Sequence, residues 1–229
     1  MQYFQSAIKA DPNFALAHLN LAFAQPNGRA FIDDVNKAVA LSDKASPGEK
    51  LWILGVQAGA NGLPSKQGEY YESLAATYPN DERAHNLLGT YYFGLQQYDK
   101  AIQQYEKAIS INQGFTPAYN LLGYSYRFKE QFDKSEQAFR KYIDLIPNDP
   151  NPYDSYAELL MKTGRYDESI ENYKKALKLN QNFTNSYVGI SDNLNFKGDF
   201  QNARAELDKM LQVARNDGER RTAIFAKAV

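Results

Sequence analysis

The sequence contains no cysteine, which excludes disulfides, thiolate metal sites and cysteine nucleophiles. It has no apolar run near the roughly 18 residues that a membrane-spanning helix needs, so we expect no membrane insertion. The formal net charge is only -1, and such a balance favours neither a nucleic acid nor an anionic membrane as a partner. A chain of 229 residues is long enough to bury a substantial core in one large domain or two small ones.

Chemistry-bearing motifs are also scarce. The only histidines, His18 and His85, are too few and too isolated in sequence to form a metal site without other ligands. The glycine-rich stretch GVQAGANGLPSKQG lacks the order G-x-x-x-x-G-K-[ST] of a phosphate-binding loop. No spacing of carboxylates singles out an acid–base pair. We therefore expect no catalytic residue, no metal and no cofactor, and a protein that is not an enzyme.

What the sequence does contain is a repeat of 34 residues. Three series of positions keep this step in one common register. The first series consists of small residues: Gly89, Gly123, Ala157 and Ser191. The second series is also small and falls in a second helix: Ala101, Ser135, Ser169 and Ala203. The third series is bulky: Tyr105, Phe139, Tyr173 and Leu207. Small residues allow two helices to approach closely, and the bulky residues fill the remaining gap.

A period of 34 residues is that of tetratricopeptide repeats, and the chain resembles this family, in arrays of the bacterial type, over nearly its whole length. The resemblance implies an all-α fold, in which antiparallel helix pairs stack into a solenoid with a right-handed superhelical path. We expect a single solenoid over 1–229. Its regular units are predicted at 82–115, 116–149, 150–183 and 184–217, with a divergent unit at 48–81, a degenerate unit at 15–47, and half-units at 1–14 and 218–229.

Local signals predict where these helices begin and turn. A side-chain acceptor precedes proline at the expected first helical position in Ser46-Pro47, Thr116-Pro117 and Asn151-Pro152. Glycines fall at the corners between paired helices, where left-handed backbone is often needed: Gly62, Gly164 and Gly198.

The resemblance also implies a binding surface. In this family the first helices line a concave groove, in which the second, fifth, sixth, ninth and twelfth positions of each unit face an extended peptide or a partner helix. Carried over to this sequence, the candidate groove residues are Arg83, Asn86, Thr90, Asn120, Tyr124, Arg127, Asp154, Ser155, Glu158, Asn185, Asp192 and Asn195.

Several of these residues admit two interpretations. Asn86 and Asn120 could pair with a peptide backbone or be solvated polar residues. Asp154 could face the groove or stabilise the start of its own helix. Arg127 could bridge to Glu158 or meet an acidic ligand residue.

The expected function is a non-catalytic protein-interaction module that binds an extended peptide or a partner helix in its concave groove. For an extended peptide, we expect one half of the ligand to be basic. The alternatives are a scaffold that self-associates through apolar terminal repeats, and the sensor or adaptor part of a longer regulatory enzyme. Half-units at both ends lead us to expect a fragment of a longer array. The start MQYFQSAIKADPNF lacks the basic and apolar segments of a signal peptide, and both cytoplasm and periplasm are compatible with it.

Overall fold

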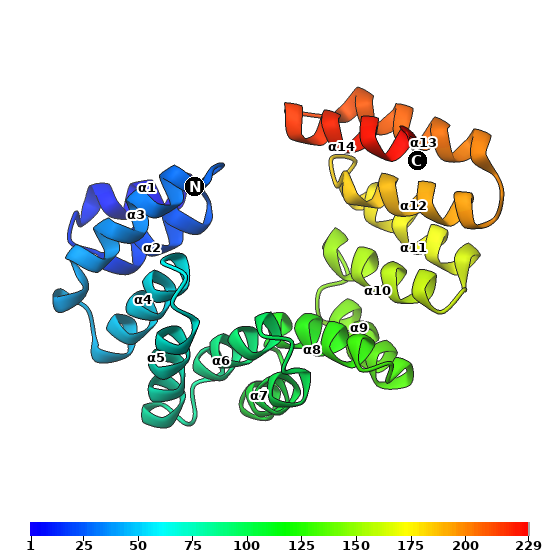
Figure 1. The fold of residues 1–229 in the computed structure, drawn as a ribbon. Coiled ribbons are helices and arrows are strands. Elements are labelled where there is room, and N and C mark those ends of the chain that lie inside the picture. Colours follow the sequence, from blue (N-terminus) through cyan, green and yellow to red (C-terminus); the bar gives the residue numbers. More distant parts are fainter. Residues whose placement is uncertain (229) are drawn as a thin grey trace. The chain divides into compact units, whose positions relative to one another are not determined.

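A computed structural model describes residues 1–228, and within them every regular element is helical (Figure 1). The expected all-α fold is therefore confirmed. None of the described helices is both long enough and apolar enough to cross a membrane. The last residue of the predicted half-unit 218–229, Val229, lies outside the described residues.

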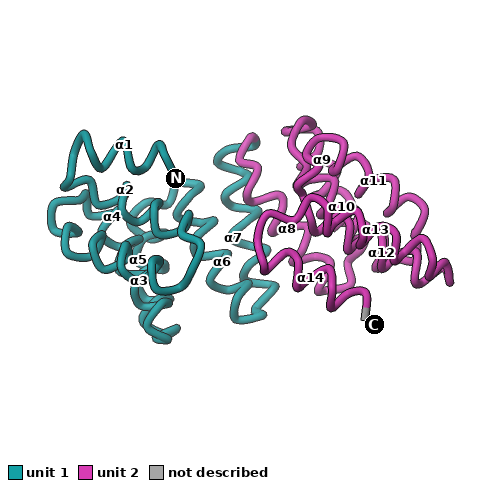
Figure 2. The backbone as a smooth tube through the Cα atoms, turned by 90° about the horizontal axis from the view of Figure 1, so that it is seen from above, with its two compact units in different colours: residues 1–113 teal, residues 114–229 magenta. Residues whose placement is uncertain are grey.

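The chain divides into two compact units, Met1–Gln113 and Gly114–Val229 (Figure 2). Unit 1 contains α1 (Gln2–Ala10), α2 (Ala15–Phe23), α3 (Gly28–Ala40), the short 3-10 helix Ser42–Lys44, α4 (Pro47–Ala60), α5 (Pro64–Thr77), α6 (Glu82–Gly94) and α7 (Tyr98–Ile111). Unit 2 contains α8 (Thr116–Phe128), α9 (Phe132–Leu145), α10 (Pro150–Lys162), α11 (Tyr166–Leu179), α12 (Asn185–Phe196), α13 (Phe200–Val213) and α14 (Asp217–Ala228).

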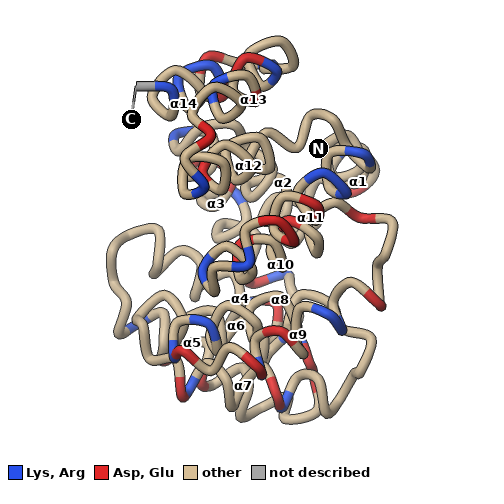
Figure 3. Tube along the Cα trace, turned by 90° about the vertical axis from the view of Figure 1, so that its right-hand side faces the viewer, with Lys and Arg blue, Asp and Glu red and all other residues tan. Residues whose placement is uncertain are grey.

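Within each unit the helices pack as consecutive pairs. In unit 1 these pairs are α2 with α3, α4 with α5, and α6 with α7; in unit 2 they are α8 with α9, α10 with α11, and α12 with α13. Each second helix also packs on the next first helix of its unit, as α5 does on α6 and α11 on α12. Basic and acidic residues are interspersed along the helices (Figure 3), in keeping with the near-zero net charge.

The predicted small positions are points of close contact between paired helices. A Cβ atom added to Gly89 would lie 2.6 Å from the ring of Tyr105, and one added to Gly123 would lie 2.6 Å from the ring of Phe139. The aromatic ring of the second helix thus lies directly on the backbone of the first. The expectation that these residues pack the pair together is confirmed.

The corners between paired helices share a left-handed residue. Gly62, Gly164 and Gly198 have φ values of 69°, 76° and 80°, as the sequence predicts. The same corner position holds Gln96 and Glu130 in two other pairs, with φ values of 59° and 57°. Because these two positions do not hold glycine, the sequence does not predict their left-handed backbone.

The helix starts confirm one of three predicted caps. The Ser46 hydroxyl accepts the backbone N–H of Glu49, whose carboxylate in turn accepts the N–H of Ser46. The other two predictions were wrong by a residue or two. Helix α8 already includes Thr116, and its preceding residue makes no side-chain cap. Helix α10 begins at Pro150, and its cap is the Asp149 carboxylate, which accepts the N–H of Asn151 at 2.8 Å.

The close approach of α6 and α7 predicts that substitution of two glycines of α6 by alanine affects stability differently. In Gly89→Ala the new methyl group overlaps the Tyr105 ring, and we expect a loss of roughly 1–3 kcal/mol in unfolding free energy. A Cβ at Gly94 meets no atom within 4 Å, so Gly94→Ala should cost nothing. Urea unfolding of both variants measures this difference. Equal stabilities would contradict the assigned packing register.

The corner residues give a second matched pair of variants. Gly164→Ala should lower stability by about 1–2 kcal/mol, because a Cβ is unfavourable in left-handed backbone. At the equivalent corner, Glu130→Gly should raise stability by roughly 0.5–1 kcal/mol, since relief of this strain outweighs the extra chain entropy of glycine. Thermal unfolding tests both. A destabilised Glu130→Gly variant would show that the Glu130 side chain contributes more than its backbone costs.

Candidate functional site

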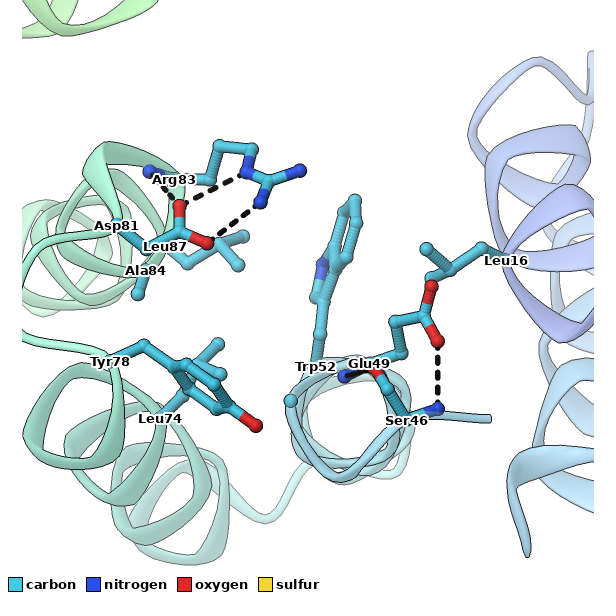
Figure 4. Close-up of a pocket in the computed structure, with 11 residues that line it drawn as sticks. Leu16, Ser46, Glu49, Trp52, Leu74, Tyr78, Asp81, Arg83, Ala84 and Leu87 are labelled. Carbon is cyan, nitrogen blue, oxygen red and sulfur yellow. Dashed lines mark hydrogen bonds and ion pairs between the residues drawn. The ribbon is translucent and has the colours of Figure 1, made fainter. Parts of the chain in front are cut away.

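Unit 1 contains a pocket of about 300 Å³ with apolar walls and a polar edge (Figure 4). Its walls come from four helices: Leu16 of α2, Trp52 of α4, Leu74 of α5 with Tyr78 at its end, and Ala84 and Leu87 of α6. In the close-up the Trp52 ring stands between the Leu16 side and the Leu87 side of the pocket.

A second pocket of about 650 Å³ adjoins the first and shares Trp52 and Leu87 with it. Further apolar and aromatic side chains complete its wall, namely Phe23, Phe31, Val56, Tyr71, Tyr91 and Leu95. We call the two pockets together the Trp52 groove. Phe23 and Leu95 are exposed at its edge, with 54% and 40% of their surface accessible.

Trp52 is the only tryptophan of the chain and forms the partition of this groove. It packs against the apolar core of α2–α4 and also against that of α5–α6. Its indole N–H is nevertheless buried without a hydrogen-bond partner. An unpaired buried donor of this kind costs the folded protein roughly 1–3 kcal/mol.

The charged side chains at the edge of the first pocket are already paired. Arg83 donates to both oxygens of Asp81, from Nε at 3.0 Å and from Nη2 at 2.8 Å. These bonds hold the pKa of Asp81 below its usual range. Glu49 is engaged in the capping interaction with Ser46. The edge therefore presents one internal ion pair and a carboxylate that is occupied as part of a helix cap.

The sequence-based candidates miss most of this groove, although the repeat positions of its residues indicate it. Trp52 occupies the fifth position of unit 48–81, Leu87 the sixth position of unit 82–115, and Phe23 the ninth position of unit 15–47. Only polar residues of the regular units were selected as candidates. The same positions in the two irregular units would have identified the apolar wall.

Three predicted site residues belong to unit 1. Arg83 lines the first pocket and Thr90 the second. The Thr90 hydroxyl donates to the backbone oxygen of Asn86 at 2.8 Å, and the Asn86 Oδ1 atom is buried without a partner. Asn86 holds the same register position as Trp52, one repeat later.

In unit 2, polar contacts join the three first helices α8, α10 and α12. The Tyr124 hydroxyl donates to Ser155 Oγ at 3.2 Å. The Ser186 hydroxyl donates to Asp154 Oδ1 at 2.6 Å. Arg127 donates to Glu158 at 3.1 Å. We call these six residues and Asp192 the polar strip.

Arg127 and Tyr124 act as one element of this strip. The Arg127 guanidinium lies 5.0 Å from the centre of the Tyr124 ring, which suits a cation–π contact, and the same guanidinium pairs with Glu158. The Tyr124 ring packs edge-on against Phe139 at 5.1 Å, and burial raises the pKa of its hydroxyl. Of the two interpretations of Arg127, the structure shows the bridge to Glu158.

Asp154 is a carboxylate held inside the strip. It is only 5% exposed, and burial raises its pKa to about 6, with a further contribution from the nearby Glu158 carboxylate. Its bond to Ser186 directs it toward α12 rather than toward the start of its own helix. Burial raises the pKa values of the Tyr124 and Tyr173 hydroxyls, and the nearby Asp154 carboxylate raises them further.

Asp192 differs from the other acidic members, because no hydrogen bond or ion pair reaches its side chain from the described residues. It is half-buried, and this burial raises its pKa. Among the described residues, it is therefore the carboxylate of the strip that has neither an ion-pair partner nor a hydrogen-bond donor.

The remaining predicted residues lie apart from these contacts. Asn120 on α8 has a buried Oδ1 atom without a partner. Asn185 is exposed at the start of α12, and Asn195 is half-buried near its end. Among the described residues, neither side chain hydrogen-bonds to the polar strip.

Both histidines bind backbone carbonyls and lie in the packed interior. His85 contacts Pro79 O at 3.1 Å and Gln104 at 2.8 Å, and His18 contacts Pro12 O at 3.3 Å. Over residues 1–228, no three histidine, aspartate or glutamate side chains are grouped so that they could hold a metal ion.

Comparison with known families identifies the repeat. Family profiles described as tetratricopeptide repeat match residues 82–115 and 116–149, and one described as TPR repeat matches 157–190. No curated protein matches the sequence.

Solved structures share the fold at low sequence identity. TTC0263, a thermophilic TPR protein of Thermus thermophilus, has a TM-score of 0.69 and 22% identity over 79% of this chain and 99% of its own. MamA from Desulfovibrio magneticus RS-1 has a TM-score of 0.64 and 16% identity over 76% and 98%. A chain of the APC/C hetero-tetramer Cut9-Hcn1 has a TM-score of 0.70 and 15% identity over 98% and 44%.

The burial of Asp154 predicts a specific pH dependence of stability. Its folded pKa of about 6 lies above the ordinary value of 3.8, so the folded protein binds the proton more tightly than the unfolded chain does. Stability from this group is thus lost as the pH rises from about 4 through 6. Asp154→Asn keeps the acceptor for Ser186 and removes the charge. We expect it to be roughly 2–3 kcal/mol more stable than wild type at pH 8 and equally stable at pH 4.

Urea unfolding of both proteins from pH 4 to pH 8 measures this difference. Two stability curves that run parallel over that range would show that Asp154 does not titrate as its burial implies.

Proposed function

The chain is a tetratricopeptide repeat protein, and we propose that it is a non-catalytic module that binds a peptide segment of another protein along its first helices. The observation that carries this proposal is the polar strip of unit 2. Polar contacts join three successive first helices, and Arg127, Glu158 and Asp192 of the strip keep partly accessible polar side chains that an extended chain could contact.

The strip is suited to binding rather than to chemistry. Its hydroxyls are bonded between helices: Tyr124 to Ser155, and Ser186 to Asp154. A nucleophile would instead need a hydroxyl activated by a base that a third group orients. We accordingly assign no catalytic step and no cofactor to these residues.

The charge of the strip favours a basic residue in the ligand. Arg127 compensates Glu158, and Asp154 is buried, which leaves Asp192 as the carboxylate available to a partner. A lysine or arginine that pairs with Asp192 would compensate the charge of this half-buried carboxylate.

Reversal of one charge tests this assignment. We expect Asp192→Lys to weaken binding of lysine- or arginine-containing peptides by about 2-fold to 30-fold, because an attraction of roughly 0.2–1 kcal/mol becomes a repulsion of similar size. It should also reduce the salt dependence of binding. Calorimetric titration of a library of capped, extended peptides provides both measurements.

The matched control is Asp144→Lys, which makes the same charge change at an exposed position of the second helix α9. Binding that responds equally to both variants would reflect overall charge, and binding unaffected by Asp192→Lys would place the ligand elsewhere.

A further inference from the structure

We infer that copies of this chain associate end to end, with α14 of one copy and α1 of a second copy forming a composite helix pair. Both helices carry an apolar face that has no partner among the described residues. These faces belong to the terminal helices and not to the polar strip, so the association is independent of the proposed peptide binding.

Helix α14 packs on α13 as a first helix packs on the second helix before it. Ala223 is buried in one apolar cluster with Leu207 of α13. One repeat earlier, Gly189 of α12 lies in the same way against α11, since a Cβ atom added there would meet the Tyr173 ring. Helix α14 therefore keeps the register of the preceding first helices.

A second face of α14 is exposed where the regular units are covered. Ile224 is 57% exposed, and Phe225, at the position of the buried Ser191, is 70% exposed. The residues at the position of Ile224 in the regular units are between 1% and 7% exposed, namely Leu88, Leu122, Tyr156 and Ile190. In a regular unit the second helix of the same pair covers this face, as the Phe139 ring covers Gly123. No second helix follows α14 among the described residues.

Helix α1 is the complementary half of such a pair. The stretch FQSAIKADPNF at 4–14 aligns with YEKAISINQGF at 105–115, the end of a regular unit. Helix α1 packs on α2, as other second helices pack on the next first helix. Phe4 takes the position of Tyr105, whose ring lies on Gly89 of its own first helix. Tyr105 is fully buried, whereas Phe4 is only half-buried, because no first helix covers it among the described residues.

The two open faces are the two sides of one helix pair, and this identifies the partner as a second copy of the chain. Their contact continues two interfaces that each copy already has, α13 with α14 and α1 with α2. It buries the apolar surface that a half-unit cannot bury alone. Because the contact joins two different surfaces, it produces open chains or closed rings of copies rather than a symmetric dimer.

The composite pair is less closely packed than the internal pairs. Phe225 stands at the position of Gly89 and Gly123, so the Phe4 ring meets a second ring instead of a bare backbone. Two aromatic rings attract each other when they stack with an offset or meet edge to face, but they keep the helix axes further apart. We therefore expect a reversible association that depends on protein concentration.

Sedimentation velocity of the intact chain over about 1–500 μM tests this association, and we expect the average mass to rise with concentration. Phe225→Glu replaces an apolar ring of the interface by a charge and should weaken the association by at least about 10-fold. Phe200→Glu makes the same change at an exposed phenylalanine of α13 and should leave the association unchanged.

A mixture of two variants tests which helices meet. Phe4→Glu damages the α1 face and keeps α14, whereas Phe225→Glu damages the α14 face and keeps α1. Each variant alone should stay monomeric, but an equimolar mixture should form a dimer and nothing larger. The mixture needs only α14 from the Phe4→Glu protein, so the result holds even if α1 is unfolded in that variant. Tyr3→Glu, at an exposed position of α1, is the control and should associate like wild type.

Several outcomes would overturn the composite pair. A wild-type chain that stays monomeric over the whole range shows that the two faces do not bind each other. Association that is lost in only one of the variants Phe4→Glu and Phe225→Glu indicates a symmetric contact of α1 with α1 or of α14 with α14. Association that neither variant changes places the interface elsewhere. Binding of basic peptides by the monomeric Phe225→Glu variant tests the proposed function separately.

Discussion

The structure depends on the contact between a glycine of one helix and an aromatic ring of its partner. At Gly89 and Gly123 the ring lies where a Cβ atom would stand, so the two helix axes approach more closely than larger residues would permit. In the pairs α6 with α7 and α8 with α9, this contact fixes the rotation of the first helix about its own axis. It thereby decides which positions are packed inside the pair and which remain for other uses.

Hydrogen bonds within the pairs reinforce that rotation. Ser135 of α9 and Ser169 of α11 donate to the backbone oxygens of Gly123 and Ala157 at 2.8 Å and 2.7 Å, which ties these second helices to their first helices, α8 and α10. With the pair locked, the fifth and ninth positions of neighbouring first helices face a common surface. In unit 1 that surface is the apolar Trp52 groove, and in unit 2 it is the polar strip.

The sequence predicts those features that recur every 34 residues. It does not predict the conformation or pairing of a residue when these depend on a neighbour about one repeat away. Gly62, Gly164 and Gly198 were identified as corners, but Gln96 and Glu130 adopt the same left-handed backbone because the helices on both sides require it. The pairing of Arg127 with Glu158 and the burial of Asp154 arise from contacts between helices, which a single-helix pattern does not encode. Trp52 was passed over because its repeat is divergent, although its register position is regular.

At the fifth position of the repeat, the packing of the helix pairs places little constraint on the type of side chain. It holds Trp52, Asn86, Asn120 and Asp154 in successive units, all on first helices whose packing positions are alike. The indole N–H of Trp52 and the Oδ1 atoms of both asparagines are buried without partners, whereas the Asp154 carboxylate receives a hydrogen bond from Ser186. An unpaired neutral polar group costs much less than an unpaired buried charge. The fold therefore tolerates the unpaired atoms of Trp52, Asn86 and Asn120 but requires a hydrogen-bond donor for Asp154. The unsatisfied members of this series are therefore a cost that the helix packing outweighs, and the aspartate contributes its hydrogen bond to the contact between α10 and α12.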